Sequence, residues 1–368
     1  MRSTRAIIHT ENFRNNIRLV REKVGSGRLI CAAVKADGYG HGSVELSRIA
    51  IEEGVDRFAV ATVQEGVALR ENGIKHPVIL LTLISPEDFE YIVRYDIQPF
   101  VADHKYAAML NMEASRFGKN VHVHLHVDTG MGRIGCAPED AASLAEDIAA
   151  LKNIKLEGMS THFACADSGD RSFTEKQMAR FKSALDSVKA LGIDPGIVHA
   201  SNSAGVLEYP ESWIDMVRPG IMLYGYYPGK ETERSLPLKP VMEFRTKVVY
   251  LKKVSAGQAL SYGATYVTKE DTMVATLPVG YGDGYNRLLS SKGEVVIRGK
   301  RYKISGRVCM DQCLVDLGAD TDVQLYDDVI LFGPDKNSPS AEDIADLTGT
   351  IPYEVTCNVN KRVPRIYV

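Results

Sequence analysis

The feature of this chain that most restricts its fold is an eightfold alternation of short apolar runs with longer amphipathic stretches. Short apolar runs bounded by turn residues indicate buried strands, and apolar residues spaced three and four apart indicate helices. The runs lie at 29–34, 57–62, 78–82, 97–101, 121–128, 156–162, 197–202 and 216–223, with helical stretches at 43–53, 104–117, 139–152 and 172–192. This pattern predicts an α/β fold that closes into a (β/α)8 barrel, with an open doubly wound sheet as the alternative.

The character of the sequence changes after the eighth run. A polar stretch, GKETERSLPLKP, precedes alternating apolar and polar residues at 244–250, 273–277, 294–297 and 314–316, which is typical of half-buried strands. A short helix is expected at 341–347 and a last strand at 362–367. We therefore predict a barrel domain over residues 1–235 and a mostly-β domain over residues 236–368. Residues 1–10 are a segment that can pack against the second domain.

Composition excludes several classes of function. The net charge is −3 and hydrophobic residues make up 45% of the chain, so there is no basic field for nucleic acid or anionic lipid. The six cysteines lack C-x-x-C spacing, which argues against a zinc site or a disulfide framework. The chain has neither the apolar run of a signal peptide nor a stretch of membrane-spanning length. We expect a cytoplasmic protein with no metal site.

Lys35 is the first candidate catalytic residue. It follows the first predicted strand in AAVKADGYGHG, where glycines allow the backbone to approach a ligand closely. An amine enclosed by barrel walls loses solvation, which lowers its pKa and allows it to form a Schiff base with a carbonyl cofactor. A solvated loop lysine is the alternative interpretation of this position.

A second group of candidates follows the seventh and eighth predicted strands. Barrels often bind phosphate there, so the backbone amides of Gly220 and Ile221 in VRPGIMLYG and the hydroxyl of Ser201 in HASNSAG are candidate phosphate ligands. Arg218 adds a permanent cation that can face a pyridine nitrogen and keep it unprotonated. A plain turn and a surface ion pair are the alternatives.

Arg133 and His162 follow the fifth and sixth predicted strands, in DTGMGRIG and STHFACAD. The guanidinium can hold an anion, and the imidazole can stack on or polarise a ring. Either residue alone is more often structural. Candidates that follow different strands at the same end of one barrel nevertheless converge, so the sequence predicts one polar pocket. Its members are Lys35, Arg133, His162, Ser201 and Arg218.

These strings, together with LSYGATY, CMDQ and IPYEV in the second half, resemble the alanine racemase family in order through nearly the whole chain. The resemblance implies pyridoxal 5'-phosphate as the cofactor, with Lys35 as its attachment point and as one catalytic base, and Tyr262 as the second base. It implies that Arg133 and the backbone of Met310 bind the substrate carboxylate. The residues implied to hold the cofactor are Lys35, Tyr39, His162, Ser201, Arg218, Gly220, Ile221 and Tyr353.

The resemblance also implies an assembly and a reaction. Tyr262 and Met310 are expected to reach the site from a partner subunit, which requires a homodimer with shared active sites. The implied reaction interconverts L- and D-alanine and supplies D-alanine for cell-wall peptidoglycan; Tyr281 and Tyr353 match residues of a narrow substrate corridor. The alternatives are a racemase of serine or of a broader range of amino acids, a related decarboxylase, and a non-enzymatic pyridoxal-phosphate carrier.

One position departs from the family's pattern. His126 stands where better-known members carry a lysine that becomes carbamylated and braces the arginine matching Arg133. A histidine cannot supply that anion, so Arg133 is expected to find another anion or water. His122 and His124 alternate with His126 along one predicted strand. Because ligands two residues apart on a strand splay, we do not expect these histidines to bind a metal.

Overall fold

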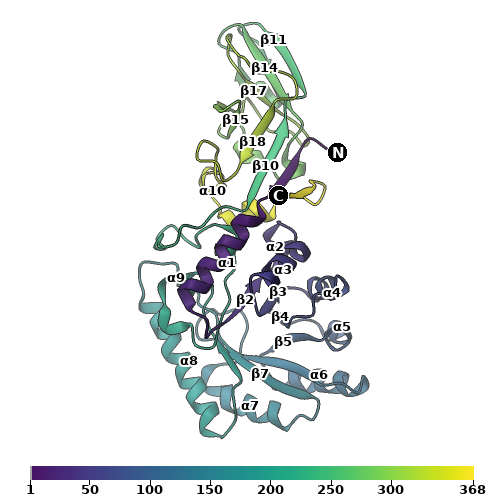
Figure 1. Cartoon of the computed structure of the whole chain (residues 1–368), viewed down its shortest axis with the longest axis vertical. Coiled ribbons are helices and arrows are strands. Elements are labelled where there is room, and N and C mark those ends of the chain that lie inside the picture. Colours follow the sequence, from purple (N-terminus) through teal and green to yellow (C-terminus); the bar gives the residue numbers. More distant parts are fainter. Residues whose placement is uncertain (1) are drawn as a thin grey trace.

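The computed structural model describes residues 2–368, which form two parts joined along the long axis of the molecule (Figure 1). One part is an eight-stranded parallel sheet with helices around it, and the other consists mostly of antiparallel strands. The predicted fold class, a (β/α)8 barrel followed by a mostly-β domain, is therefore confirmed.

The barrel strands are ordered β8-β7-β6-β5-β4-β3-β2-β9, and neighbouring strands in this order pair in parallel. Backbone hydrogen bonds from Asp215 N to Val198 O (3.2 Å) and from Arg218 N to Ser201 O (2.8 Å) join the two outer segments, which closes the sheet. The strands are β2 (Leu29–Ala33), β3 (Arg57–Val60), β4 (Val78–Leu80), β5 (Ile97–Val101), β6 (Val121–His126), β7 (Ile154–Ser160), β8 (Ile197–His199) and β9 (Met216–Val217).

Helices surround the barrel strands because the strands are apolar on both faces. Ile30, Cys31 and Ala32 of β2, for example, are all fully buried. The helices of this half are α1 (Thr10–Val24), α2 (Lys35–Tyr39), α3 (Ser43–Glu52), α4 (Val63–Glu71), α5 (Phe89–Tyr95), α6 (His104–Arg116), α7 (Ala141–Ala150), α8 (Ser172–Ala190) and α9 (Ser203–Glu208). Capping residues mark where some of these helices begin. At α4, for example, Thr62 and Glu65 form a capping box.

The eighth strand is shorter than the sequence predicts. β9 ends at Val217, and Ile221–Tyr224 forms the 3-10 helix η4 instead of continuing the strand. Pro219 has no amide hydrogen for the ladder, and Gly220 adopts φ −120° and ψ −100°, outside the strand region. The interruption leaves Gly220 and Ile221 at the mouth of the barrel.

The second part contains a six-stranded sheet in the order β16-β15-β18-β10-β1-β19, a three-stranded sheet β11-β14-β17 and the hairpin β12-β13. The first strand of the chain lies inside the larger sheet, antiparallel to β10 and parallel to β19. The elements are β1 (Arg5–Ile8), β10 (Met242–Lys247), β11 (Tyr250–Val254), β12 (Ala259–Leu260), β13 (Tyr266–Val267), β14 (Thr272–Leu277), β15 (Glu294–Ile297), β16 (Lys300–Lys303), β17 (Cys313–Asp316), β18 (Asp328–Phe332), β19 (Arg365–Tyr367), α10 (Ala341–Thr348) and α11 (Pro352–Cys357).

The C-terminal strand β19 contacts the loop that follows the first barrel strand. Arg365 Nε donates a hydrogen bond to Gly40 O (2.9 Å), and Tyr367 Oη donates one to His41 O (3.1 Å). A Cβ at Gly40 would lie 2.2 Å from Thr356 O, so only glycine allows α11 to pack this closely. The second part of the molecule therefore helps to fix the backbone after Lys35. No helix within residues 2–368 has the length and apolar character needed to cross a bilayer.

Candidate functional site

Lys35 begins a turn of unusual handedness at the end of β2. Ala36, Asp37 and Tyr39 have φ of 51°, 53° and 51°, in the left-handed region, and Gly38 has φ 61°. Each non-glycine residue in this conformation costs roughly 1–2 kcal/mol. Such strain persists only where surrounding contacts determine the backbone, and it is common at functional sites.

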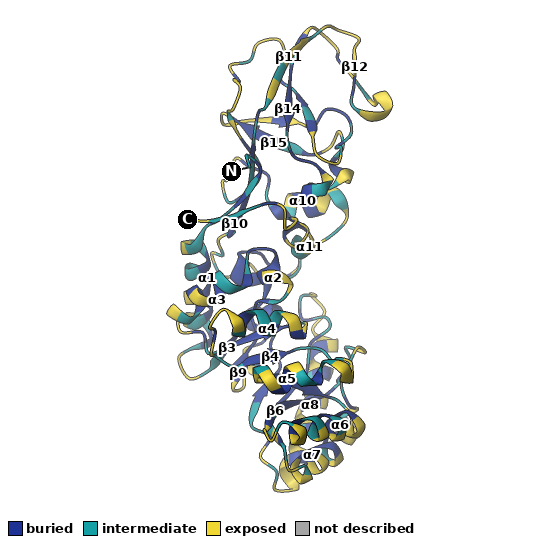
Figure 2. Cartoon of the chain, turned by 90° about the vertical axis from the view of Figure 1, so that its right-hand side faces the viewer, coloured by how far each residue is buried: buried dark blue, intermediate teal, exposed yellow. Residues whose placement is uncertain are grey.

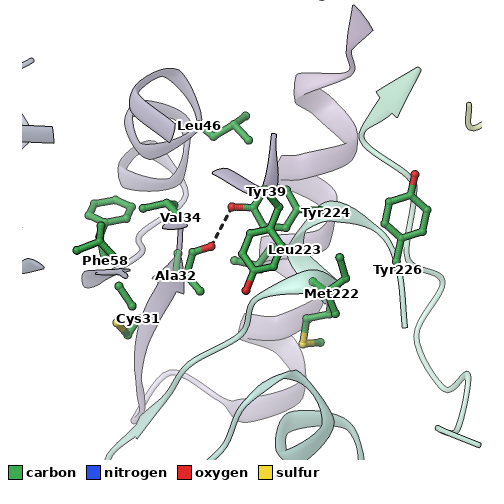
Figure 3. Packing of buried hydrophobic residues seen from close by; sticks show 14 of the residues in the cluster. Cys31, Ala32, Val34, Tyr39, Leu46, Phe58, Met222, Leu223, Tyr224 and Tyr226 are labelled. Carbon is green, nitrogen blue, oxygen red and sulfur yellow. Dashed lines mark hydrogen bonds between the residues drawn. The ribbon is translucent and has the colours of Figure 1, made fainter. Parts of the chain in front are cut away.

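Three contacts hold this turn in place. Glu65 Oε1 accepts a hydrogen bond from Ala36 N (2.6 Å), and Asp37 Oδ1 accepts one from Ser43 N (2.9 Å). The Tyr39 ring packs against the Tyr224 ring with 4.7 Å between the centroids (Figure 3). The turn therefore presents the Lys35 amine and the Tyr39 hydroxyl on a rigid support.

These two side chains face a cavity of about 470 Å³ at the mouth of the barrel. Most of the predicted site residues of the barrel contribute to its wall. The lining residues are Ala33, Lys35, Tyr39, Leu81, Met131, Arg133, His162, Phe163, Ala164, Asp167, Asn202, Ser203, Ala204, Arg218, Gly220, Ile221, Pro228, Ile351 and Tyr353. The predicted polar pocket thus exists, and side chains from several strand ends meet in it.

Lys35 has the environment that the sequence predicts for a reactive amine. Burial lowers its pKa, and the nearby Arg133 cation lowers it further, while the Glu65 carboxylate acts in the opposite direction. A lowered pKa makes the neutral amine more abundant near neutral pH. That form can act as a base or as a nucleophile.

Arg218 is a buried cation with no acidic partner among the described residues. Its Nη1 donates to His199 Nδ1 (2.6 Å), and its Nη2 donates to Thr161 O (2.8 Å), Ala200 O (3.0 Å) and His162 Nδ1 (3.3 Å). Burial lowers the pKa of Arg218 to about 10, so it is still a cation at neutral pH. Burial and the Arg218 cation together lower the pKa of His162 well below its usual range, which leaves that ring neutral.

The predicted phosphate ligands divide into two groups. Gly220, Ile221 and Tyr353 line the cavity, whereas the fully buried Ser201 does not. The Ser201 hydroxyl instead hydrogen-bonds Ser212 O (2.9 Å). β8 ends at His199, earlier than predicted. The second serine of HASNSAG, Ser203, is therefore already the first residue of α9.

Ser203 lies at the cavity wall, where we expected Ser201. Its Oγ accepts hydrogen bonds from Gly220 N (2.8 Å) and Met222 N (3.5 Å), and it lines the cavity. Because these amides use its lone pairs, its hydroxyl proton is free for a ligand. The same rule that selected Ser201, a hydroxyl after the seventh strand, applies equally to Ser203. Asn202 and Glu65 were not among the predicted site residues.

Tyr262 and Met310 lie outside this cavity. Tyr262 is 71% exposed in the short helix η5 (Tyr262–Ala264), beyond β12 at the end of the molecule remote from the barrel (Figure 2). Met310 is 54% exposed. Neither residue lines the cavity of its own chain.

His126 is enclosed in the barrel and forms no hydrogen bond with Arg133. Its ring stacks on Phe100 with 4.4 Å between centroids, and its Nδ1 lies 2.8 Å from Ser160 Oγ. Burial lowers the pKa of His126 to about 3, so the ring is neutral. Arg133 is exposed and forms no ion pair with a carboxylate of residues 2–368. Within the same residues, no cluster of three or more potential ligands could hold a metal ion.

A parallel barrel whose mouth gathers a desolvated amine, a buried guanidinium and a second, exposed guanidinium around one cavity defines an enzyme of the (β/α)8 class. Residues 8–228 match the alanine racemase N-terminal domain and residues 241–367 match the alanine racemase C-terminal domain. The chain therefore belongs to the alanine racemase family, as its motifs predict, and the predicted enzyme class of amino-acid racemase is confirmed at the level of this family.

Individual relatives from the same family are similar to this chain over its full length. The alanine racemase of Treponema denticola is 46% identical over 375 residues, which cover 100% of this chain and 99% of that protein. A solved structure of alanine racemase from Clostridium difficile superposes with a TM-score of 0.97 at 38% identity, covering 100% of this chain and 96% of that one. A structure from E. faecalis gives a TM-score of 0.93 at 35% identity, covering 100% and 98%.

Proposed function

We propose that this protein interconverts L- and D-alanine with pyridoxal 5'-phosphate as its cofactor. The observation that carries the proposal is the single cavity that brings Lys35, Arg133, His162 and Arg218 together at the barrel mouth. The names of the relatives support alanine as the substrate. In a cell the product would supply D-alanine for cell-wall peptidoglycan, and we place the enzyme in the cytoplasm.

The cavity fits this cofactor. Tyr39 Oη has no hydrogen-bond partner within residues 2–368, and Ser203, which accepts from the Gly220 amide, has a free hydroxyl proton. These two hydroxyls, with the backbone of Ile221 and the hydroxyl of Tyr353, are suited to phosphate oxygens, and Gly220 leaves the space beside Tyr39 Oη open. Arg218 is suited to a pyridine nitrogen, because a guanidinium can donate but cannot accept a hydrogen bond. When bound, pyridoxal 5'-phosphate supplies an electron sink for the charge left by removal of the α proton.

Two bases on opposite faces of the substrate are required, because inversion removes a proton on one side and returns one on the other. The Lys35 Nζ removes or delivers the proton on its face of the Cα atom. The phenol oxygen of the partner subunit's Tyr262 does so on the other face. Arg218, which stays a cation, would hold the ring nitrogen as a hydrogen-bond donor, and that nitrogen would then stay unprotonated. This would weaken the electron sink and favour return of the proton over side reactions.

Substrate orientation depends on charge and on space. The exposed Arg133 guanidinium can pair with the substrate carboxylate, together with the backbone amide of the partner subunit's Met310. The assembly that we propose is a homodimer in which each barrel mouth is completed by the other subunit. Within each chain we place the domain boundary between residues 235 and 236.

The proposed function is tested by incubating the purified protein with single L-amino acids and separating the enantiomers by chiral chromatography. We expect conversion of L-alanine to the racemic mixture and no release of CO2. Carbon dioxide release would instead identify a decarboxylase. Absence of both reactions in protein loaded with the cofactor would contradict the proposal.

We expect alanine to be the best substrate, serine weaker, and larger side chains weaker still. Tyr353 and Ile351 line the cavity, and one added methylene or hydroxyl in a tight apolar site changes the rate by about tenfold or more. The measurement is kcat/KM for alanine, serine, lysine and arginine under identical conditions. Faster turnover of lysine or arginine than of alanine would show that the site is wider than we propose.

Replacing Gly220 with alanine will weaken cofactor binding. A Cβ there would lie 2.7 Å from Tyr39 Oη, closer than real contacts allow, and Tyr39 is packed too tightly to move away. We expect the Kd of pyridoxal 5'-phosphate, from absorbance titration of the apoprotein, to rise about tenfold or more. Gly27→Ala is the matched control, because nothing lies within 4 Å of its Cβ position. Equal Kd values for the two variants would exclude Gly220 from the phosphate site.

A further inference from the structure

A row of hydrogen-bonded side chains runs through the interior of the barrel, starting at Arg218. Arg218 Nη1 lies 2.6 Å from His199 Nδ1, and His199 Nε2 lies 3.0 Å from His124 Nδ1. His124 Nε2 in turn lies 3.3 Å from Gln98 Oε1. The row leads away from the cavity, because His199 ends β8 while Gln98 is the second residue of β5.

The row continues to the opposite end of the barrel. Arg57 donates from Nη1 to Gln98 Oε1 (3.0 Å) and from Nη2 to Glu157 Oε1 (2.8 Å). His122 Nδ1 lies 3.0 Å from Glu157 Oε2, and the His122 side chain is 43% exposed. Arg57 is the first residue of β3 and His122 the second of β6, so both lie at the N-terminal ends of their strands. The cavity is thereby connected to the base of the barrel.

The central part of this row is shielded from solvent. His124 and His199 are fully buried, and Gln98 is 8% exposed. The Phe100 ring packs beside both imidazoles, with centroid distances of 6.4 Å and 6.3 Å. Burial lowers the pKa of His124 to about 3 and that of His199 well below its usual range, so both rings are neutral. Hydrogen bonds in such an environment are strong, and breaking one leaves an unpaired buried group.

Only one arrangement of protons satisfies every bond in the row. Arg218 can only donate, so His199 Nδ1 must accept and the proton of His199 must lie on Nε2. That proton is donated to His124 Nδ1, which places the proton of His124 on its own Nε2. His124 then donates to the Gln98 carbonyl oxygen. The order of donors therefore runs from Arg218 toward Gln98.

Gln98 determines which nitrogen of His124 carries the proton, at the end of the row farther from Arg218. Its Oε1 faces two donors, His124 Nε2–H and the Arg57 guanidinium, and the Arg57–Glu157 ion pair holds the guanidinium in place. Without that acceptor, His124 can shift its proton to Nδ1. His199 would then carry its proton on Nδ1 and meet Arg218 Nη1 donor to donor, which would displace the guanidinium.

We propose that Gln98 and His124 are positioning residues, which fix the tautomer of His199 and through it the orientation of the Arg218 guanidinium at the cavity. The role of Arg218 in the reaction rests on the proposed function above. The order of the protons does not depend on that function, so the two can be tested separately.

Proton positions in the unaltered holoenzyme give the first test. Neutron diffraction from perdeuterated crystals should place deuterium on Nε2 of both His124 and His199 and none on either Nδ1. Deuterium on Nδ1 of either ring would overturn the inference, even in an enzyme that racemises alanine. Failure of the proposed function would appear differently, as the absence of racemisation by the same unaltered protein.

Matched substitutions at Gln98 give the second test. Gln98→Met keeps the length of the side chain and removes the acceptor, whereas Gln98→Glu keeps an acceptor beside Arg57. We expect kcat of Gln98→Met to fall about tenfold with little change in KM, and Gln98→Glu to recover most of the rate. Equal kcat values for the two variants, or a loss confined to KM, would contradict a role through Arg218.

Discussion

Lys35→Ala will lower kcat/KM for alanine racemisation by about a thousandfold or more, because it removes both a catalytic base and the proposed attachment of the cofactor. The residue is singular among the lysines of the chain: it lines the cavity, and burial and the Arg133 cation lower its pKa. The two guanidinium groups of the cavity cannot replace it as a base, since Arg133 and Arg218 have no lone pair to accept a proton.

Two measurements separate loss of this amine from general damage. Borohydride reduction of the unaltered holoenzyme, followed by peptide mapping, should place the pyridoxyl label on Lys35. Lys189→Ala, at an exposed position of α8, should keep the full rate. A label on another lysine, or comparable rates for the two variants, would show that Lys35 is neither the attachment point nor the base.

The barrel was predictable because its strands are buried on both faces and therefore read as continuous apolar runs. Cys31 and Phe58, from different runs, are both fully buried. Strand ends were less predictable, since they depend on where neighbouring strands stop pairing. The expected strand 216–223 ends at Val217, where Pro219 and Gly220 take the chain out of the ladder.

The conformation after Lys35 was not predictable from local preferences. Ala36 and Asp37 ordinarily avoid positive φ, and their left-handed conformation depends on Glu65 and Ser43, which come from other segments. The sequence identified the glycines of this loop but not the residues that hold it. Glu65 could be identified only as part of the capping box that starts α4.

The histidines of β6 keep the alternation of the strand. The rings of His124 and His126 both pack against Phe100, and the register shift in the pairing falls on β7, where Glu157 is left unpaired. The three rings nevertheless meet different partners, namely Glu157, His199 with Gln98, and Ser160. Neither the shift nor the buried row of polar groups has a signal in the sequence pattern.

Mixing Lys35→Ala subunits with Tyr262→Phe subunits will restore activity that neither variant has alone. Tyr262 is 71% exposed and absent from the cavity of its own chain, so we expect it to serve the neighbouring barrel. In a mixed dimer, one site then has both bases and the other has neither. Random exchange of equal amounts makes half of the dimers mixed, so about a quarter of the wild-type activity should return.

The reverse mixture distinguishes shared sites from sites within one chain. When wild-type subunits exchange with an equal amount of the double variant Lys35→Ala/Tyr262→Phe, sharing inactivates both sites of every mixed dimer. The activity of the wild-type subunits should therefore fall to about half of its value before exchange. A second base within the same chain, for which Asp167 in the cavity wall is the candidate, predicts that Tyr262→Phe is active by itself and that exchange changes the activity of neither mixture. That pair of results, after subunit exchange has been verified, would assign the second base to the subunit that carries Lys35.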